Sequence, residues 1–227
     1  MNYTELVAEI QSYTQNYESD FVANIPTFID QAETRIYNTV QIPALRKNVT
    51  GLTTNGNKYL SCPSDFLSVF SIAVIDGDGN YEYLLNKDVN FLRASYPNPN
   101  IEGLPKYYAL FGPTVVTSTI TDELSFILAP TPDAIYSVEL HYYYYPVSIA
   151  DTQLNPDGRT WLGDNYSPVL LYGSLVEAYI FLKGEADMMG YYEKKYQDAL
   201  AQLNRLGTGL ERGDAYRDGQ AKIKVMP

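Results

Sequence analysis

Residues 167–182 have the sequence SPVLLYGSLVEAYIFL, and this stretch decides the fold. Ser167 fits a helix N-cap, and Pro168 fits the first turn of the helix that follows. From Val169 to Leu182 the residues are apolar on nearly every side, which is typical of a helix buried over most of its surface. Gly184 is expected to stop this helix. The sequence therefore predicts a buried helix in the second half of the chain.

A second helical pattern follows directly. Its apolar positions are spaced by three, four, three, four and three residues, as along a coiled-coil seam, and they are Met189, Tyr192, Tyr196, Ala199, Leu203 and Leu206. Gly207 is expected to end this helix. Together the two segments predict an αα-hairpin.

Two further helices are predicted at the start of the chain. The first begins at a capping box formed by Asn2 and Glu5. Its apolar stripe is Leu6, Ile10, Tyr13 and Tyr17. The second is expected to carry Pro26 in its first turn and to end before Pro43. Its stripe is Ile29, Ala32, Ile36 and Val40.

The middle of the chain has the texture of a β domain. Short apolar or alternating runs, broken by Gly, Pro, Asn and Asp, predict strands over 58–61, 67–75, 81–85, 106–111, 124–128 and 136–145. The segment from Asp76 to Asn80 predicts a hairpin turn, and residues 88–95 predict one short helix. Because no long helices separate the strands, we expect an antiparallel β-sandwich or a small barrel rather than a parallel sheet.

This layout predicts an α+β protein with a discontinuous helical bundle. The helical domain comprises residues 1–45 and 151–206, and the β-rich insertion domain comprises residues 46–150. Residues 207–227 form a C-terminal arm that lacks a helical stripe. Within the arm, Lys222, Ile223, Lys224 and Val225 alternate polar and apolar side chains, the pattern of a strand that adds to a sheet edge.

Composition excludes several classes of protein. The chain has 227 residues, and its net charge of −11 argues against a free-standing DNA-binding module. Its one cysteine, Cys62, excludes an intramolecular disulfide and a cysteine-rich zinc site. We expect no secretory signal and no membrane span. The 22 tyrosines are the unusual feature of the composition.

Catalytic patterns are mostly missing. His141 is the only histidine and lies in a strand-like run, so we expect it to be structural. The loop that begins at Asp76 lacks the glycine and the glutamate of a calcium site. Paired carboxylates among Asp122, Glu123 and Glu177 leave a glycosidase open as the least favoured hypothesis. We expect no enzyme activity, no cofactor and no metal.

The tyrosines leave two interpretations open. Tyrosine supplies a large, rigid contact surface with a polar tip and is enriched at protein interfaces. Residues 142–145 are four consecutive tyrosines, which places two rings on each face of one strand. Half of them could fill the β-domain core, or several could lie between subunits.

Short segments near both ends of the chain carry a recognisable pattern. The N-terminal segments are FVANIP at 21–26, FI at 28–29 and AETRIY at 32–37. The C-terminal segments are TWL at 160–162, LLYGSLVEA at 170–178, FLKGE at 181–185, YEKKY at 192–196 and AL at 199–200. In this order and spacing, the segments resemble the head-to-tail adaptor proteins of tailed bacteriophages. The resemblance implies a non-enzymatic structural protein that forms a ring of about twelve copies. The ring would lie between portal and tail and surround the DNA channel.

The resemblance also implies partners and contact residues. The arm would bind the portal protein through Arg212, Tyr216, Arg217, Lys222, Ile223, Lys224 and Val225. Subunit contacts would involve Met189, Tyr192, Tyr196, Tyr143 and Tyr145. A loop on the tail side would carry Asp76, Asp78 and Asn80, facing a tail or nozzle protein. We expect the protein in the neck of the virion, assembled in the host cytoplasm, with DNA passing through unbound.

One alternative function belongs to a different class. A phage tail or surface binding module would present aromatic side chains of its β domain to a carbohydrate or receptor. Tyr143 and Tyr145 are the residues that such a module would use.

Overall fold

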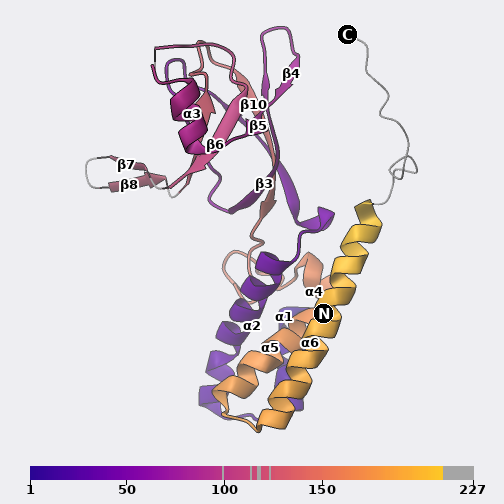
Figure 1. Ribbon diagram of the computed structural model, residues 1–227. Helices are drawn as coiled ribbons and strands as arrows, with labels where there is room; N and C mark the ends of the chain where they lie inside the picture. Colours follow the sequence, from indigo (N-terminus) through magenta and orange to yellow (C-terminus); the bar gives the residue numbers. More distant parts are fainter. Residues whose placement is uncertain (99, 113, 117–118, 123, 212–227) are drawn as a thin grey trace. The chain divides into compact units, whose positions relative to one another are not determined.

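The computed structural model describes all residues except 99, 113, 117–118, 123 and 212–227 (Figure 1). The chain divides into two compact units. Residues 1–45 and 146–227 belong to the first, called here the helical unit, and residues 46–145 form the second, called the sheet unit. The helical unit is therefore interrupted in sequence by the sheet unit.

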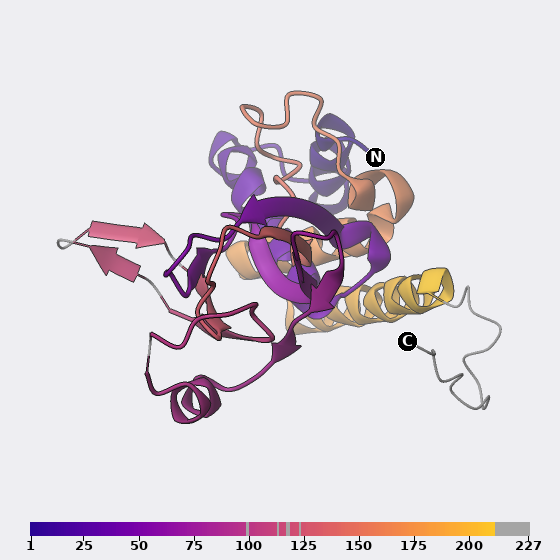
Figure 2. The same ribbon diagram turned by 90° about the horizontal axis from the view of Figure 1, so that it is seen from above.

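The helical unit is arranged around one central helix. Its elements are α1 (Tyr3–Thr14), α2 (Ser19–Thr39), the 3₁₀ turn η1 (Pro43–Leu45), α4 (Trp161–Asn165), α5 (Ser167–Phe181) and α6 (Ala186–Glu211). Helix α5 contacts α1, α2, α4 and α6, and Figures 1 and 2 show α6 running along it. The apolar surface of residues 167–182 is thus covered by neighbouring helices, as the sequence predicts.

Helix α1 starts at the predicted capping box. The Asn2 Oδ1 atom accepts a hydrogen bond from the Glu5 backbone at 2.9 Å, and Glu5 Oε2 accepts one from the Asn2 backbone at 3.0 Å. Leu6 and Ile10 are fully buried. The helix ends at Thr14, and Gln15 adopts a left-handed conformation. Tyr17 therefore lies beyond the helix, which corrects its predicted place in the stripe.

Helix α2 begins earlier than predicted. It starts at Ser19, so Pro26 lies inside the helix and not in its first turn. Phe21 and Ile25 explain the longer helix, because both are buried on the same face as Ile29. Proline has no backbone N–H, so the Val22 carbonyl loses its donor inside the helix. Pro26 and Val22 are both half-buried rather than buried.

Helix α6 extends past Gly207, which was predicted to end it. The helix continues to Glu211, and Gly207 is buried within it. A Cβ atom at this position would collide with the side chain of Ile42, just before η1. Gly207 is therefore present to allow close packing and not to terminate the helix.

The sheet unit contains ten strands and one short helix among its described residues. They are β1 (Arg46–Leu52), β2 (Tyr59–Ser61), β3 (Phe66–Ile75), β4 (Tyr81–Tyr83), β5 (Leu85–Asn86), α3 (Val89–Ser95), β6 (Tyr107–Phe111), β7 (Thr114–Val116), β8 (Thr119–Asp122), β9 (Ser125–Ala129) and β10 (Ser137–Tyr144). One four-stranded sheet has the order β1-β10-β3-β4, and another has the order β2-β9-β6-β5. Strands β7 and β8 pair separately and project from the rest of the unit (Figures 1 and 2).

The two four-stranded sheets share one hydrophobic core. Buried side chains of both sheets form a single cluster of Ile72, Val74, Leu84, Tyr108, Phe126, Leu128, Val138, Leu140 and Tyr142. Phe66 of the first sheet meets Phe126 of the second edge to face, with ring centroids 5.6 Å apart. The mixed α+β class is therefore confirmed.

Two details of the predicted sheets are wrong. The sheets do not close into a barrel, because their outer strands β1 and β2 are not paired with each other. The sheets are also not antiparallel throughout, since β5 pairs parallel with β6. Parallel neighbours need a crossover connection, and α3 lies within the connection between these two strands.

Candidate interaction surfaces

Glu177, the one acidic residue of α5, is paired inside the helical unit. Arg35 of α2 donates a hydrogen bond of 2.9 Å to Glu177 and one of 3.2 Å to Glu193 of α6. The same guanidinium lies 4.7 Å from the ring centroid of Tyr196. Glu177 therefore holds three helices together through Arg35 and is not a free carboxylate for acid catalysis. The side chains of Asp122 and Glu123, its predicted partners in that hypothesis, lie outside the described residues.

Tyr192 and Tyr196, predicted at a subunit interface, are buried within the chain itself. Their side chains are 5% and 2% exposed. The rings of Tyr192 and Tyr179 are 4.8 Å apart between centroids. Burial, together with a hydrogen bond to Tyr179, raises the pKa of Tyr192 to about 12. Met189, on the same helix, is half-buried. The apolar seam predicted along this helix is therefore explained by the packing of α6 against other helices of the same chain.

Tyr143 and Tyr145 belong to the sheet unit. The Tyr143 hydroxyl accepts hydrogen bonds from Arg46 at 2.7 and 3.0 Å, and its ring is buried. The Arg46 guanidinium also stacks over the exposed ring of Phe70, 3.9 Å from its centroid. Tyr145 is half-buried, and its backbone donates a hydrogen bond of 2.9 Å to Asp65. The contacts of Arg46 with Tyr143 and Phe70 form a cation–aromatic stack on the face of the first sheet that points away from the core.

The predicted tail-side loop is the turn between β3 and β4. Asp76 Oδ1 accepts hydrogen bonds of 2.9 Å from the backbones of Asp78 and Asn80, and Oδ2 accepts one of 3.0 Å from the Asn80 side chain. Hydrogen bonds from Asn80 hold the pKa of Asp76 below its ordinary value. Asp76 is therefore used to shape the turn, and the exposed Asp78 carboxylate points a negative charge into solvent.

His141 has a structural environment. Its Nδ1 atom lies 3.1 Å from Ser71 Oγ, and its Nε2 atom lies 3.3 Å from Glu139 Oε1. All three side chains lie on strands β3 and β10, and none of them lines a described pocket. The arrangement links two strands of the sheet, in agreement with the structural role expected for this residue.

The sequence did not single out Glu33, whose carboxyl group is buried in the helical unit. Glu33 Oε1 accepts a hydrogen bond of 3.1 Å from the backbone of Ile149, in the segment that precedes α4. Burial raises the pKa of Glu33 to about 7. The one sequence feature that could have indicated a buried carboxyl group is the position of Glu33 beside Ala32, on the buried stripe of α2.

A group of exposed aromatic and apolar side chains lies where α1 and α5 end and where α2 and α6 begin. This end of the helical unit can be followed in Figure 1. Tyr17 is 70% exposed and Tyr191 is 52% exposed. The group, called here the aromatic end, consists of Tyr13, Tyr17, Ile180, Phe181, Met188 and Tyr191. Exposed aromatic groups of this kind are characteristic of protein interfaces. The sequence pattern does not indicate this group, because Tyr13 and Tyr17 fit a buried helical stripe.

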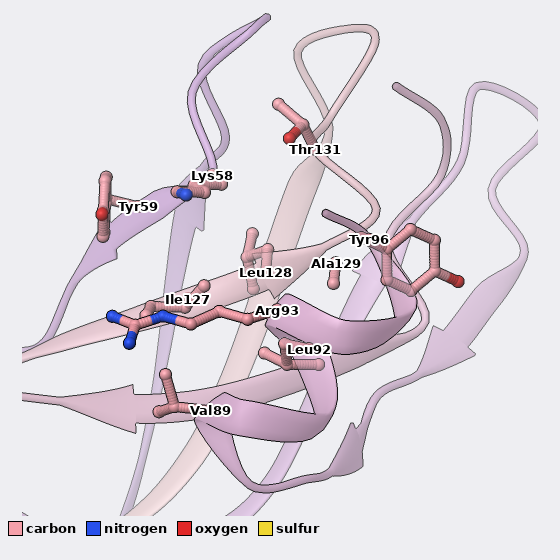
Figure 3. A pocket seen from close by; sticks show the side chains of 10 residues that line it. All are labelled: Lys58, Tyr59, Val89, Leu92, Arg93, Tyr96, Ile127, Leu128, Ala129 and Thr131. Atoms are coloured by element: carbon pink, nitrogen blue, oxygen red, sulfur yellow. The ribbon is translucent and has the colours of Figure 1, made fainter. Parts of the chain in front are cut away.

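A small pocket lies between α3 and the second sheet (Figure 3). Its cavity volume is about 50 Å³, and its floor is formed by Leu92 of α3 with Ile127 and Ala129 of β9. Figure 3 shows the Arg93 side chain extended across the pocket and Lys58 at its rim. Arg93 is exposed and Lys58 is half-buried, so the two cations can hold an acidic group above this apolar floor only weakly.

A larger apolar slot opens between the outer strands β1 and β2. Its cavity volume is about 260 Å³, and it reaches Phe126, Val138 and Leu140 of the shared core. No sequence pattern predicted this slot, because it arises from the failure of the two sheets to meet at one side.

Two kinds of feature are absent from the part of the chain that the structure describes. Among these residues, no helix has the length and apolar character needed to cross a membrane. The described ranges also contain no group of three or more His, Cys, Asp or Glu side chains placed to hold a metal ion. The predicted arm residues, from Arg212 to Val225, lie outside the described residues.

Exposed aromatic side chains and an open sheet edge are features of a protein that works through contacts with other proteins. Comparison with known families agrees. Residues 1–221 match the family model described as SU10 adaptor protein, and the chain belongs to that family. It is therefore a bacteriophage adaptor protein and a component of the virion, which confirms the resemblance seen at its two ends. A search of curated proteins gives no match.

Proposed function

We propose that this protein is the head-to-tail adaptor of its phage, a ring-forming structural protein without enzyme activity. The observation that carries the proposal is the family match over residues 1–221, which includes both units. The ring would contain about twelve copies and lie in the neck of the virion, between the portal and the tail or nozzle protein. Its copies would assemble in the host cytoplasm.

The charge of the chain suits a protein that surrounds DNA without gripping it. Twelve copies at −11 each would place about 130 net negative charges around the channel. Such a wall repels phosphates, so DNA can slide past it during packaging and ejection. The acidic turn with Asp78 at its tip is the proposed contact on the tail side, together with Asp76 and Asn80.

The aromatic end is the best supported subunit contact. Tyr17 and Tyr191 are exposed in the single chain, and burial against a neighbour would remove large aromatic surfaces from water. Met189, half-buried on the same helix as Tyr191, remains a candidate for the rim of such a contact. Tyr145, half-buried in the sheet unit, remains a candidate for a separate subunit contact. The arm after Glu211 is the proposed portal contact, with Arg212, Tyr216 and Arg217 in its first part.

Truncation of the arm tests the portal contact. Helix α6 is described as far as Glu211, so a chain that ends there keeps every described helix. We expect the truncated chain to lose binding to purified portal rings while its circular dichroism spectrum stays like that of the full chain. Normal portal binding by the truncated chain would contradict the arm assignment.

Ring formation is tested separately. Tyr17→Ser combined with Tyr191→Ser should lower the yield of rings in electron micrographs of the protein mixed with its portal. Tyr81→Ser combined with Tyr83→Ser is the matched control, since these tyrosines are also exposed but lie in the sheet unit. Equal ring yields for the two double variants would show that the aromatic end is not a subunit contact.

One observation favours a second candidate function. Tyr81 and Tyr83 are exposed on β4 with stacked rings whose centroids are 6.2 Å apart, a surface on which a sugar ring can lie. A binding module for a carbohydrate or receptor would use this pair, because Tyr143 is already occupied by Arg46. Glycan-array binding that disappears in the Tyr81→Ser, Tyr83→Ser variant would support this function over the adaptor ring.

A further inference from the structure

The apolar slot exposes the core of the sheet unit at one side. It is lined by apolar side chains and backbone from both sheets, chiefly Val49, Leu60, Cys62, Phe126, Val138 and Leu140. An apolar cavity of about 150 Å³ can hold a benzene molecule, so this slot of about 260 Å³ has room for aliphatic side chains.

The residues of β1 leave this slot uncovered. Val49 is paired with Leu140 and Gly51 with Val138, so both face the core side of the first sheet. Val49 is nevertheless 38% exposed. Gly51 has no side chain to close the gap, and a Cβ atom placed there would touch nothing within 4 Å. The core therefore lacks a covering layer along β1.

Strand β1 also offers a free backbone edge. It is the outermost strand of its sheet and pairs with β10 alone among the strands that the structure describes. From Lys47 to Leu52 every residue is exposed. An exposed edge strand beside an apolar slot can accept one more strand, with alternate side chains of the added strand entering the slot.

The chain itself carries a segment with the matching pattern. Residues 222–225 alternate Lys, Ile, Lys and Val, so that Ile223 and Val225 would share one face of a strand and the two lysines the other. Ten residues separate Glu211, the last described residue of α6, from Lys222, which corresponds to at most about 40 Å of extended chain. A tether of this length allows the segment to be offered to a neighbouring copy.

We propose that residues 222–225 of a second copy of this chain add as a strand to the free edge of β1 and place Ile223 and Val225 in the apolar slot. The added strand covers the exposed core at Val49 and supplies the missing partner for the edge. Lys222 and Lys224 then point away from the slot and stay available to the portal. The inference rests on the proposed function in one respect, because it needs copies of the chain to assemble side by side.

Cys62 allows a direct test, because this only cysteine lines the slot. In the full chain, Val225→Cys is expected to form a disulfide with Cys62 under mild oxidation. Lys224→Cys is the matched control, since its side chain would lie on the opposite face of the strand. We expect cross-linking at 225 to be at least about tenfold faster than at 224, because disulfide geometry requires Cβ atoms within a few Å.

Mixing two variants identifies the donor of the strand. A tagged chain carrying Cys62→Ser and Val225→Cys has no slot cysteine, so any disulfide to an untagged wild-type chain joins position 225 to Cys62 of that chain, and a dimer of two tagged chains is distinguished by its mass. The proposal predicts a cross-linked heterodimer whose yield rises with protein concentration. A synthetic peptide of residues 219–227 should suppress the heterodimer, and the same peptide with Ile223→Asp and Val225→Asp should not.

Three results would overturn the proposal. They are equal rates at 224 and 225, no cross-link at either position, and a cross-link within one Val225→Cys chain that is independent of concentration. Portal binding by the same variants separates this inference from the proposed function. A missing cross-link with intact rings on the portal would refute only the strand exchange, whereas missing rings would refute the adaptor function itself.

Discussion

Two glycines of α6 give opposite predictions for the same substitution. Gly190 and Gly207 both lie inside the helix, where alanine is favoured over glycine by about 1 kcal/mol. A Cβ atom at Gly190 would meet nothing within 4 Å, whereas one at Gly207 would collide with Ile42, which is 1% exposed and enclosed by the core. Gly190→Ala should therefore stabilise the helical unit, and Gly207→Ala should destabilise it.

The magnitudes follow from two opposing contributions. Overpacking of a closed core costs about 1–3 kcal/mol. The helix-propensity gain of about 1 kcal/mol offsets part of this cost, so we expect Gly207→Ala to lower the free energy of unfolding of the helical unit by up to about 2 kcal/mol. Gly190→Ala should raise it by about 0.5–1 kcal/mol. The two variants should thus differ by about 2 kcal/mol.

Trp161 provides the assay. It is the only tryptophan of the chain and lies on α4, so its fluorescence reports on the helical unit and not on the sheet unit. Urea unfolding followed by this emission should give midpoints that differ by about 1 M, for a slope near 2 kcal/mol per M. If Gly207→Ala proved as stable as Gly190→Ala, the close approach of η1 to α6 would not be the reason for the glycine.

Two further predictions use the same tryptophan emission. Burial raises the pKa of Glu33 to about 7 from an ordinary 4.5. Between these two values the folded state keeps a proton that the unfolded state loses. The free energy of unfolding should therefore fall by about 3 kcal/mol as the pH rises from 4.5 to 7. Glu33→Gln should remove most of this fall, and an unchanged pH profile would show that Glu33 does not cause it. Arg35→Met should destabilise the helical unit by about 1–2 kcal/mol at pH 7, because Glu177 is only 15% exposed and loses its partner. Glu193→Gln, at a carboxylate that is 39% exposed, should cost less than about 0.5 kcal/mol, and equal losses for the two variants would contradict this difference.

The helices were largely predictable because their signals are local. The capping box at Asn2 and the apolar length of residues 167–182 each depend on neighbours a few residues away. The predicted start of α2 and the predicted end of α6 were wrong for the same reason. Pro26 and Gly207 are residues that usually mark helix boundaries, and both were retained inside helices by tertiary packing, which a local pattern does not contain.

The sheet arrangement was less predictable because pairing joins distant residues. The strand pattern predicted strands, but the parallel pair of β5 and β6 depends on α3 acting as a crossover. The open side between β1 and β2 depends on which strands become outermost. Neither the parallel pair nor the open side can be predicted from the alternation of polar and apolar residues along a single strand.

The candidate contact residues show the same limit. A seam of Tyr192, Tyr196 and Leu203 has identical spacing whether its partner is a helix of the same chain or of a neighbour. In the structure the partners are helices of the same chain, since all three side chains are buried without a second copy. Tyr17 and Tyr191, by contrast, become conspicuous only when their exposure is known. Sequence spacing identifies a contact face but not the molecule on the other side.

The tyrosines fall into two groups with different chemistry. Two buried ones have hydroxyl partners inside the chain, Asp65 for Tyr142 at 2.8 Å and Arg46 for Tyr143 at 2.7 Å. Tyr17 and Tyr191, by contrast, are 70% and 52% exposed. A subunit that first folds alone and later assembles needs a contact surface that is well hydrated in the single chain. The same surface must bury a large apolar area when the subunits associate. Tyrosine meets both needs where leucine or phenylalanine would favour unspecific association before assembly.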